Sequence, residues 1–144
     1  MARGKLNFLL DTHVLIWWTG ESNKISNTVK NLLMDENNTI FISFVSVWEI
    51  QIKSQLGKLE LNLPLAKLIQ DQQTINRFQL LPISLNHIYF LENLPQHHKD
   101  PFDRLLISQS IIEQMPILNV DKLFDLYSVQ RIWKCLYSVQ RIWK

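Results

Sequence analysis

Four acidic side chains are the residues of this sequence most able to do chemistry together. Each follows a short apolar run or stands near the start of a helical pattern, and they are Asp11, Glu49, Asp103 and Asp121. Carboxylates brought close together repel one another, and burying even one unpaired anion is costly. A divalent cation is the usual solution, and Mg²⁺ or Mn²⁺ held by carboxylates can catalyse phosphodiester hydrolysis. We therefore expect the four acids to form one metal site.

Two of the acids come at the end of expected strands. Asp11 directly follows LNFLL at 6–10, and Asp121 directly follows PILNV at 116–120. Ligands of open α/β sheets bind at the carboxyl ends of parallel strands. This placement predicts that both carboxylates lie at one edge of a sheet.

Each acid also has a purely structural interpretation. Residues 46–49 match a capping box, in which Glu49 would bond back to the helix start. Asp100 precedes Pro101 and is the favoured N-cap of the next helix, which leaves Asp103 one turn deeper as the metal ligand. The two acids that follow strands could likewise cap the segments after them. The joint pattern favours the metal site, because helix starts beside strand ends are themselves good positions for cation ligands.

The elements alternate along the chain. Strands are expected at 6–10, 39–43, 78–83, 116–120 and 129–133, and helices at 12–18, 27–35, 47–56, 64–76, 84–93 and 101–114. Strands that alternate with helical patterns indicate a parallel sheet covered by helices on both faces. The fold class is therefore α/β.

Length and composition bound the class of protein. The chain has 144 residues, 47% of them hydrophobic and 19% charged, which is typical of one globular domain. Its apolar runs are shorter than the ~18 residues of a membrane helix, and the amino terminus lacks the pattern of a signal peptide. The single cysteine, Cys135, cannot form an internal disulfide. We expect a cytoplasmic protein with no membrane association.

The carboxyl terminus carries a short duplication. LYSVQRIWK at 126–134 recurs letter for letter at 136–144. We predict a domain over 1–134 and a duplicated tail over 135–144, with VQRIW at 129–133 as the closing strand. The net charge of +2 comes from Arg141 and Lys144 in that tail, so the rest of the chain is neutral. Charge is therefore weak evidence for a nucleic-acid partner.

Four segments together resemble a known family. LLDTHVLIWW at 9–18, SVWEI at 46–50, HKDPFDRLLISQS at 98–110 and VDKLFDLYSVQRIW at 120–133 are similar, in the same order, to motifs of the PIN domain family and of its VapC-type toxin ribonucleases. The resemblance covers residues 6–133. It implies a three-layer α/β/α sandwich with a mostly parallel central sheet. It also implies an endoribonuclease that needs Mg²⁺ or Mn²⁺.

The resemblance carries over to particular residues and partners. Asp11, Glu49, Asp103 and Asp121 match the family's acidic quartet, and Asn119 stands where relatives often have Thr. An RNA substrate, an antitoxin protein of a type II toxin–antitoxin pair that covers the site, and a homodimer are implied as partners. We expect one or two ions among the quartet, with a metal-activated water as the nucleophile.

Several other residues are weaker candidates. Thr12 could touch metal-bound water or phosphate, or cap a helix, and Arg104 could bind a scissile phosphate or form a salt bridge. Asp100 and Asn119 could contact ligand or substrate from beside the quartet. The run His97–Lys99 could meet the RNA backbone or form a solvated loop. His13 could orient a carboxylate, although a structural histidine is favoured, and Trp17 and Trp18 are expected in the core or a dimer interface.

Two alternatives remain open from the sequence. The first is a non-catalytic PIN-like module that binds RNA or protein. The second is a haloacid-dehalogenase-like phosphatase, which also begins with an aspartate after its first strand. That family's motif is DxD, whereas Asp11 is followed by Thr12 and His13. Metal-dependent cleavage that a chelator abolishes would separate these alternatives.

Overall fold

The central layer is a five-stranded parallel sheet. The computed structural model describes residues 6–134. The strands are β1 (Leu6–Leu10), β2 (Asn38–Ser43), β3 (Gln79–Leu81), β4 (Ile117–Leu118) and β5 (Arg131–Ile132). They lie in the order β3-β2-β1-β4-β5, and every neighbouring pair is parallel. All the strands therefore end at the same edge of the sheet.

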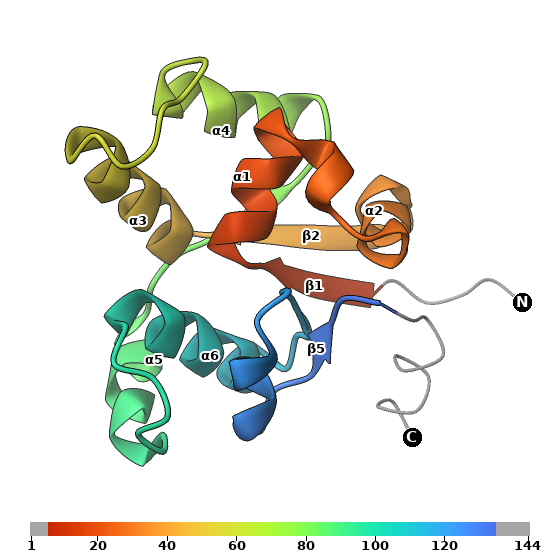
Figure 1. The fold of residues 1–144 in the computed structure, drawn as a ribbon. Coiled ribbons are helices and arrows are strands. Elements are labelled where there is room, and N and C mark those ends of the chain that lie inside the picture. The colour runs from red at the N-terminus through yellow and green to blue at the C-terminus, as the bar shows by residue number, and fades with distance from the viewer. Residues whose placement is uncertain (1–5, 135–144) are drawn as a thin grey trace, which may run out of the picture.

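Helices cover both faces of this sheet. They are α1 (Thr12–Gly20), α2 (Asn27–Met34), α3 (Phe44–Gln55), α4 (Leu65–Thr74), α5 (Leu85–Tyr89) and α6 (Pro101–Glu113), with short 3₁₀ helices η1 (Ser22–Lys24), η2 (Phe90–Asn93) and η3 (Lys122–Leu126). Figure 1 shows α1 to α4 on one side of the sheet and α5 and α6 on the other. The expected three-layer α/β/α sandwich is confirmed.

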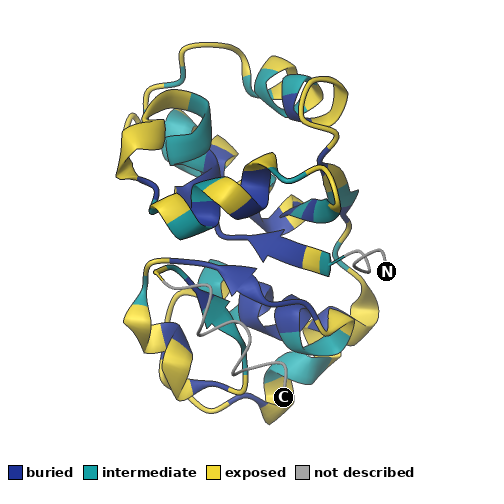
Figure 2. Ribbon diagram, turned by 90° about the vertical axis from the view of Figure 1, so that its right-hand side faces the viewer, coloured by how far each residue is buried: buried dark blue, intermediate teal, exposed yellow. Residues whose placement is uncertain are grey.

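Strand β1 shows why both faces must be covered. Phe8 and Leu10 point into a core that includes Val29 of α2, whereas Leu9, between them, packs with Leu106 of α6 in a second core. All three β1 side chains are fully buried (Figure 2). A strand buried on both sides is the mark of a parallel sheet between two helical layers.

Polar caps set the helix starts, and one of them differs from the prediction. Asp100 accepts hydrogen bonds from the backbone nitrogens of Phe102 and Asp103, as expected for the N-cap of α6. Helix α3, however, begins at Phe44 with Ser43 as its cap, three residues before the predicted start. The capping box at 46–49 was therefore wrong. A hydroxyl at the end of β2 is already available to cap the helix, so Glu49 lies in its second turn.

The first copy of the repeated segment forms the edge strand. Strand β5 is shorter than the predicted 129–133 and pairs with β4 through Leu118 and Ile132. The ring of Trp133 lies 5.9 Å from that of Trp17, which anchors this edge to α1. The second copy lies outside the described residues. Within the described part, every helix is too short or too polar to cross a membrane.

Candidate metal centre

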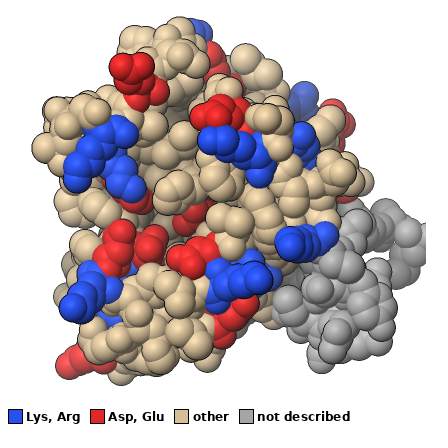
Figure 3. Space-filling model, viewed as in Figure 1, with Lys and Arg blue, Asp and Glu red and all other residues tan. Residues whose placement is uncertain are grey.

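The predicted acidic quartet lies around one cavity at the carboxyl edge of the sheet. Asp11 follows β1, Asp121 follows β4, Glu49 comes from α3 and Asp103 from the first turn of α6. The cavity measures about 320 Å³, and all four acids line it together with His13, Trp17, Lys53, Asp100, Asn119, Val120 and Phe124. Figure 3 shows acidic side chains gathered in the hollow between the two halves of the molecule, with basic side chains around it.

The two deepest acids are held in different ways. Asp11 is 2% exposed, and its Oδ2 accepts a hydrogen bond of 3.0 Å from the backbone nitrogen of His13. Glu49 is 3% exposed, and its Oε2 lies 2.6 Å from Lys53 Nζ. The other oxygen, Oε1, is buried and has no hydrogen-bond partner among residues 6–134. An unpaired buried carboxylate oxygen is costly, and a cation would satisfy it.

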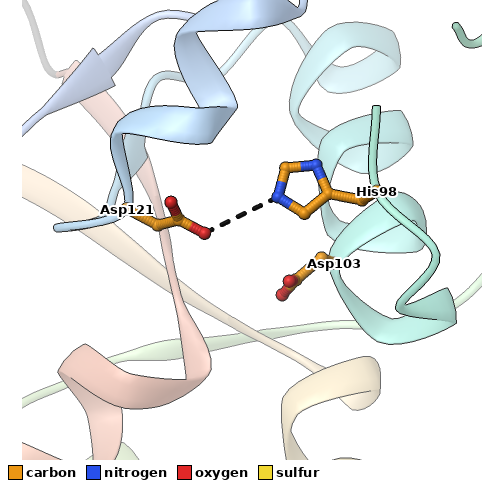
Figure 4. Close-up of side chains that lie close together, drawn as sticks. All are labelled: His98, Asp103 and Asp121. Atoms are coloured by element: carbon orange, nitrogen blue, oxygen red, sulfur yellow. Dashed lines mark ion pairs between the residues drawn. The ribbon is translucent and has the colours of Figure 1, made fainter. Parts of the chain in front are cut away.

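The other two acids lie beside a histidine. Ligand atoms of His98, Asp103 and Asp121 all lie within 4.8 Å of one another (Figure 4). His98 Nε2 lies 3.6 Å from Asp121 Oδ2. The other oxygen of Asp121 caps η3 by accepting from the backbone nitrogen of Leu123. Asp121 therefore has one carboxylate oxygen turned toward the cluster.

The electrostatics of Asp103 show how closely the acids approach. Burial, and after it the negative charges of Asp100, Asp11, Glu49 and Asp121, together raise the pKa of Asp103 to about 7. A carboxyl that titrates near neutrality in this way marks a place where negative charge is crowded. Such perturbed groups are concentrated at functional sites.

Two basic side chains respond to the same crowding. The pKa of His13 is raised, chiefly by its hydrogen bond with Asp11, although burial opposes the shift. Burial lowers the pKa of Lys53, but its hydrogen bond to Glu49 and the charge of that acid outweigh this effect and raise the pKa. Both side chains therefore favour their cationic forms at the cavity.

These residues fit a hard divalent cation. The donors are carboxylate oxygens from four separate elements, and oxygen donors are the ligands that Mg²⁺ and Mn²⁺ prefer. The unpaired Glu49 Oε1 and the raised pKa of Asp103 both show excess negative charge that a cation would relieve. We place the candidate metal centre here.

Three further predicted residues lie at or beside this centre. Thr12 is buried, and its hydroxyl donates to Ser46 Oγ at 2.8 Å, so it joins α1 to α3. Asp100 lines the cavity while it caps α6. Asn119 Oδ1 accepts from the backbone nitrogen of Asp121 at 2.9 Å, and Asn119 Nδ2 is buried without a partner in the described chain. Asn119 thus holds the turn that presents Asp121.

Among residues 6–134 Arg104 forms no salt bridge, contrary to one expectation, and its binding to a phosphate stays a prediction. Its guanidinium donates to the backbone carbonyls of Pro95 and Leu91, at 2.8 and 3.2 Å. These contacts hold the segment before α6 instead of reaching an acid, because the side chain lies on the side of α6 that faces this segment. Arg104 therefore supports the loop that leads into the site.

Sequence reasoning missed two residues of the site. Lys53 follows Glu49 by four positions, and this spacing on a helix was the signal for their ion pair. His98 was expected to lie in a solvated loop or to meet RNA, but it is 8% exposed and faces the acids. Its neighbour His97 is exposed, and nothing in the run HHK distinguishes the two.

Trp17 and Trp18 are partly buried against the core. Trp17 pairs with Trp133, and Trp18 lies 6.2 Å from the ring of Phe78 while its Nε1 donates to Gln72 at 2.9 Å. The expected core role is therefore confirmed for both.

Comparison with known proteins places this architecture in a family. The model of the PIN domain family matches residues 8–129. No curated protein sequence gives a significant match.

Chains of similar fold occur in solved structures of VapBC and FitAcB. A chain of VapBC2 from Rickettsia felis, bound to a DNA fragment from their promoter, is 18% identical, with a TM-score of 0.69, and the match covers 89% of this chain and 99% of that one. DNA-bound VapBC from Salmonella typhimurium is 16% identical, with a TM-score of 0.63, and the match covers 90% of this chain and 98% of that one. FitAcB from Neisseria gonorrhoeae is 15% identical, with a TM-score of 0.56, and the match covers 87% of this chain and 96% of that one. With its parallel sheet, its acidic cavity and a family match over most of its length, this chain belongs to the PIN domain family.

Proposed function

We propose that this protein is a Mg²⁺- or Mn²⁺-dependent endoribonuclease and the toxin of a type II toxin–antitoxin pair. One observation carries the proposal: four acids from four elements of a PIN domain line a single cavity. The VapBC structures of similar fold, together with the resemblance to VapC-type toxins, support the same assignment. The phosphatase alternative has lost its basis, because the chain belongs to a different family.

Asp11, Glu49, Asp103 and Asp121 would hold the cation. When bound, a divalent cation activates water as a nucleophile and stabilises negative charge on the phosphate. Before the cation binds, Lys53 neutralises one oxygen of Glu49, and Asp103 can hold a proton at neutral pH. The chain's own contribution is to bring these four groups together at one edge.

The attacking group is water in this proposal. The residues that line the cavity include no serine, threonine or cysteine. Thr12, the hydroxyl nearest to Asp11 in the sequence, already donates to Ser46 inside the protein. The lining of this cavity therefore offers no hydroxyl or thiol nucleophile, and we propose hydrolysis by water.

An antitoxin is the proposed protein partner. Helix α3 carries Glu49 on its inner face and exposes Phe44 and Trp48, which are 43% and 54% accessible. The ring of Trp48 packs edge-on against Phe102 of α6, 5.0 Å away, so the apolar surface continues across two elements beside the cavity. A partner that covers this surface would also cover the metal centre. Self-association into a homodimer is proposed on the family resemblance.

RNA cleavage tests the proposal directly. The purified protein should cut a fluorescently labelled RNA in Mg²⁺ or Mn²⁺, lose the activity in a chelator, and regain it when the ion is restored. A DNA strand of the same sequence serves as the substrate control. Cleavage that continues unchanged in chelator would contradict metal dependence. Tight RNA binding without cleavage in any ion would favour the non-catalytic alternative.

A further inference from the structure

His98 presents one ring nitrogen to two of the acids, Asp103 and Asp121. It is 8% exposed and lies in the segment between η2 and α6. Tyr127 fixes the ring from one side: its hydroxyl oxygen accepts from the backbone nitrogen of His98 at 2.8 Å and lies 3.2 Å from His98 Nδ1. Phe124 packs against the same ring with centroids 5.2 Å apart at 81°. The orientation of the imidazole is thus determined by its neighbours.

The other ring nitrogen has no hydrogen bond. His98 Nε2 is buried and unpartnered within residues 6–134. The nearest charged atom is Asp121 Oδ2 at 3.6 Å, which is too far for a good hydrogen bond. Figure 4 shows the ring directed toward Asp121, with the Asp103 carboxylate beside both. Buried polar atoms are nearly always satisfied, so an unpaired nitrogen aimed at two acids indicates a ligand.

We propose that His98 Nε2, together with Asp103 and Asp121, forms a cation site with one nitrogen donor, which takes a transition-metal ion such as Co²⁺ in preference to Mg²⁺. Imidazole is a good ligand for borderline transition ions, whereas Mg²⁺ is held by oxygen. Ligating histidines usually hold their second ring nitrogen through a hydrogen bond, and Tyr127 occupies that place. Two donors at about 2.1 Å from one ion lie roughly 3–4 Å apart, which agrees with the 3.6 Å observed.

This inference shares two acids with the proposed nuclease centre, and it adds a ligand and a metal preference that the quartet alone does not give. Asp11 and Glu49 lie in the same cavity but outside the His98 cluster. The quartet therefore supplies an oxygen-only environment on one side. His98 makes the other side suited to a softer ion.

Calorimetric titration of the full chain with Co²⁺ and, separately, with Mg²⁺ tests the proposal. His98→Asn should weaken Co²⁺ binding at least about tenfold and change Mg²⁺ binding less than about threefold. The matched control is His97→Asn, at the exposed neighbour. It should keep Co²⁺ binding within about threefold of the parent. Equal Co²⁺ affinity for parent and His98→Asn would overturn the proposal.

A second measurement detects the coordinated histidine in the parent protein itself. Proton NMR of the Co²⁺-loaded parent protein should show a strongly shifted, solvent-exchangeable ring N–H from a coordinated imidazole. The signal should persist in His97→Asn and vanish in His98→Asn. Tyr127→Phe should keep the signal but make its N–H exchange faster, because the hydroxyl partner is gone. Absence of any such resonance in the parent at saturating Co²⁺ would show that nitrogen does not bind the ion.

The outcomes separate this inference from the proposed function. If the protein cleaves RNA in Mg²⁺ but binds Co²⁺ equally well with and without His98, the nuclease proposal is supported and the proposal of a nitrogen ligand is contradicted. If the Co²⁺ signal depends on His98 but the protein cleaves no RNA, the proposal of a nitrogen ligand is supported and the nuclease proposal is contradicted.

Discussion

Lys53 Nζ lies 2.6 Å from Glu49 Oε2, one turn further along α3. The Glu49 side chain is 3% exposed and that of Lys53 is 35% exposed, so the acid is inside and its counterion reaches it from the rim. One helix thus brings a proposed metal ligand and a positive charge to the same cavity. The ammonium group stabilises the carboxylate, and we expect it to compete with a bound cation for Glu49.

Lys53→Met should lower stability and increase the response to metal. Removal of the ammonium group leaves Glu49 buried without its counterion, at a cost of about 1–3 kcal/mol in the cation-free protein. The Glu49 carboxylate, which no longer has its ammonium partner, should then bind a cation more tightly. Mg²⁺ or Mn²⁺ should therefore raise the melting temperature of the variant more than that of the parent. Thermal melts in chelator and in metal measure both effects.

The matched control is Lys67→Met on α4. Lys67 forms the same kind of pair, with Nζ 2.8 Å from Asp71 Oδ1, but on the exterior and away from the cavity. An exposed pair contributes little, so stability should change by about 0.5 kcal/mol or less and the metal response should not change. An equal loss of stability in both variants would contradict the special role of the Lys53 pair.

The raised pKa of Asp103 predicts how stability depends on pH without metal. The pKa is about 7 in the folded protein against a usual 3.8, so the folded state keeps this proton to higher pH than the unfolded chain does. The contribution of this group therefore favours folding at low pH and is lost as pH rises from about 4 to about 7. Asp103→Asn removes this dependence.

Denaturant unfolding in chelator at several pH values between 5 and 8 measures the difference between the parent and Asp103→Asn. The free energy of unfolding of the variant, relative to the parent, should rise with pH over this range. A constant difference across the range would mean that Asp103 has an ordinary pKa and that the acids are less crowded than the structure indicates.

The hydroxyl pair between α1 and α3 should be coupled. Thr12→Val leaves Ser46 buried without its partner and should cost about 1–3 kcal/mol, and Ser46→Ala should do the same to Thr12. The double variant should be less destabilised than the sum of the two, because neither partner is left unpaired. Additive losses in a double-mutant cycle would show that the bond does not position these helices.

A chain that ends at Lys134 should keep its fold and its activity. The first copy of the repeat already supplies β5, and Trp133 accepts a bond from Ser26 through its carbonyl while its ring packs on Trp17. Size-exclusion chromatography, thermal melting and RNA cleavage of the shortened chain check this expectation. Unfolding on removal of 135–144 would show that the second copy, and not the first, completes the domain.

Much of the fold was predictable because its signals are local. Strand β1 and helix α6 were correctly located by an apolar run and by the Asp100–Pro101 start. The start of α3 was not, because Ser43 and Ser46 are both good caps and sequence alone does not show which of them ends the strand. Their hydrogen bonds distinguish them: Ser43 Oγ accepts from the backbone nitrogen of Val45, whereas Ser46 Oγ accepts from the Thr12 hydroxyl.

The acids of the site were predictable and their neighbours were not. Parallel strands that end at one edge bring Asp11 and Asp121 together whatever the details of packing. His98 became part of the cluster only through its contacts with Tyr127 and Phe124, which lie far along the chain. Such a contact depends on how η3 packs against the loop before α6, and the spacing of residues in the sequence does not predict it.

The most direct test of the central claim compares RNA cleavage by purified Asp103→Asn and Asp71→Asn in the same Mg²⁺ or Mn²⁺ buffer. Both changes remove one carboxylate charge, but Asp71 lies on α4 and does not line the cavity. We predict that Asp103→Asn folds at least as stably as the parent in chelator, gains less stability from metal, and loses cleavage, whereas Asp71→Asn cleaves as the parent does. Unchanged cleavage by folded Asp103→Asn would contradict the assignment of this cavity as the catalytic metal centre.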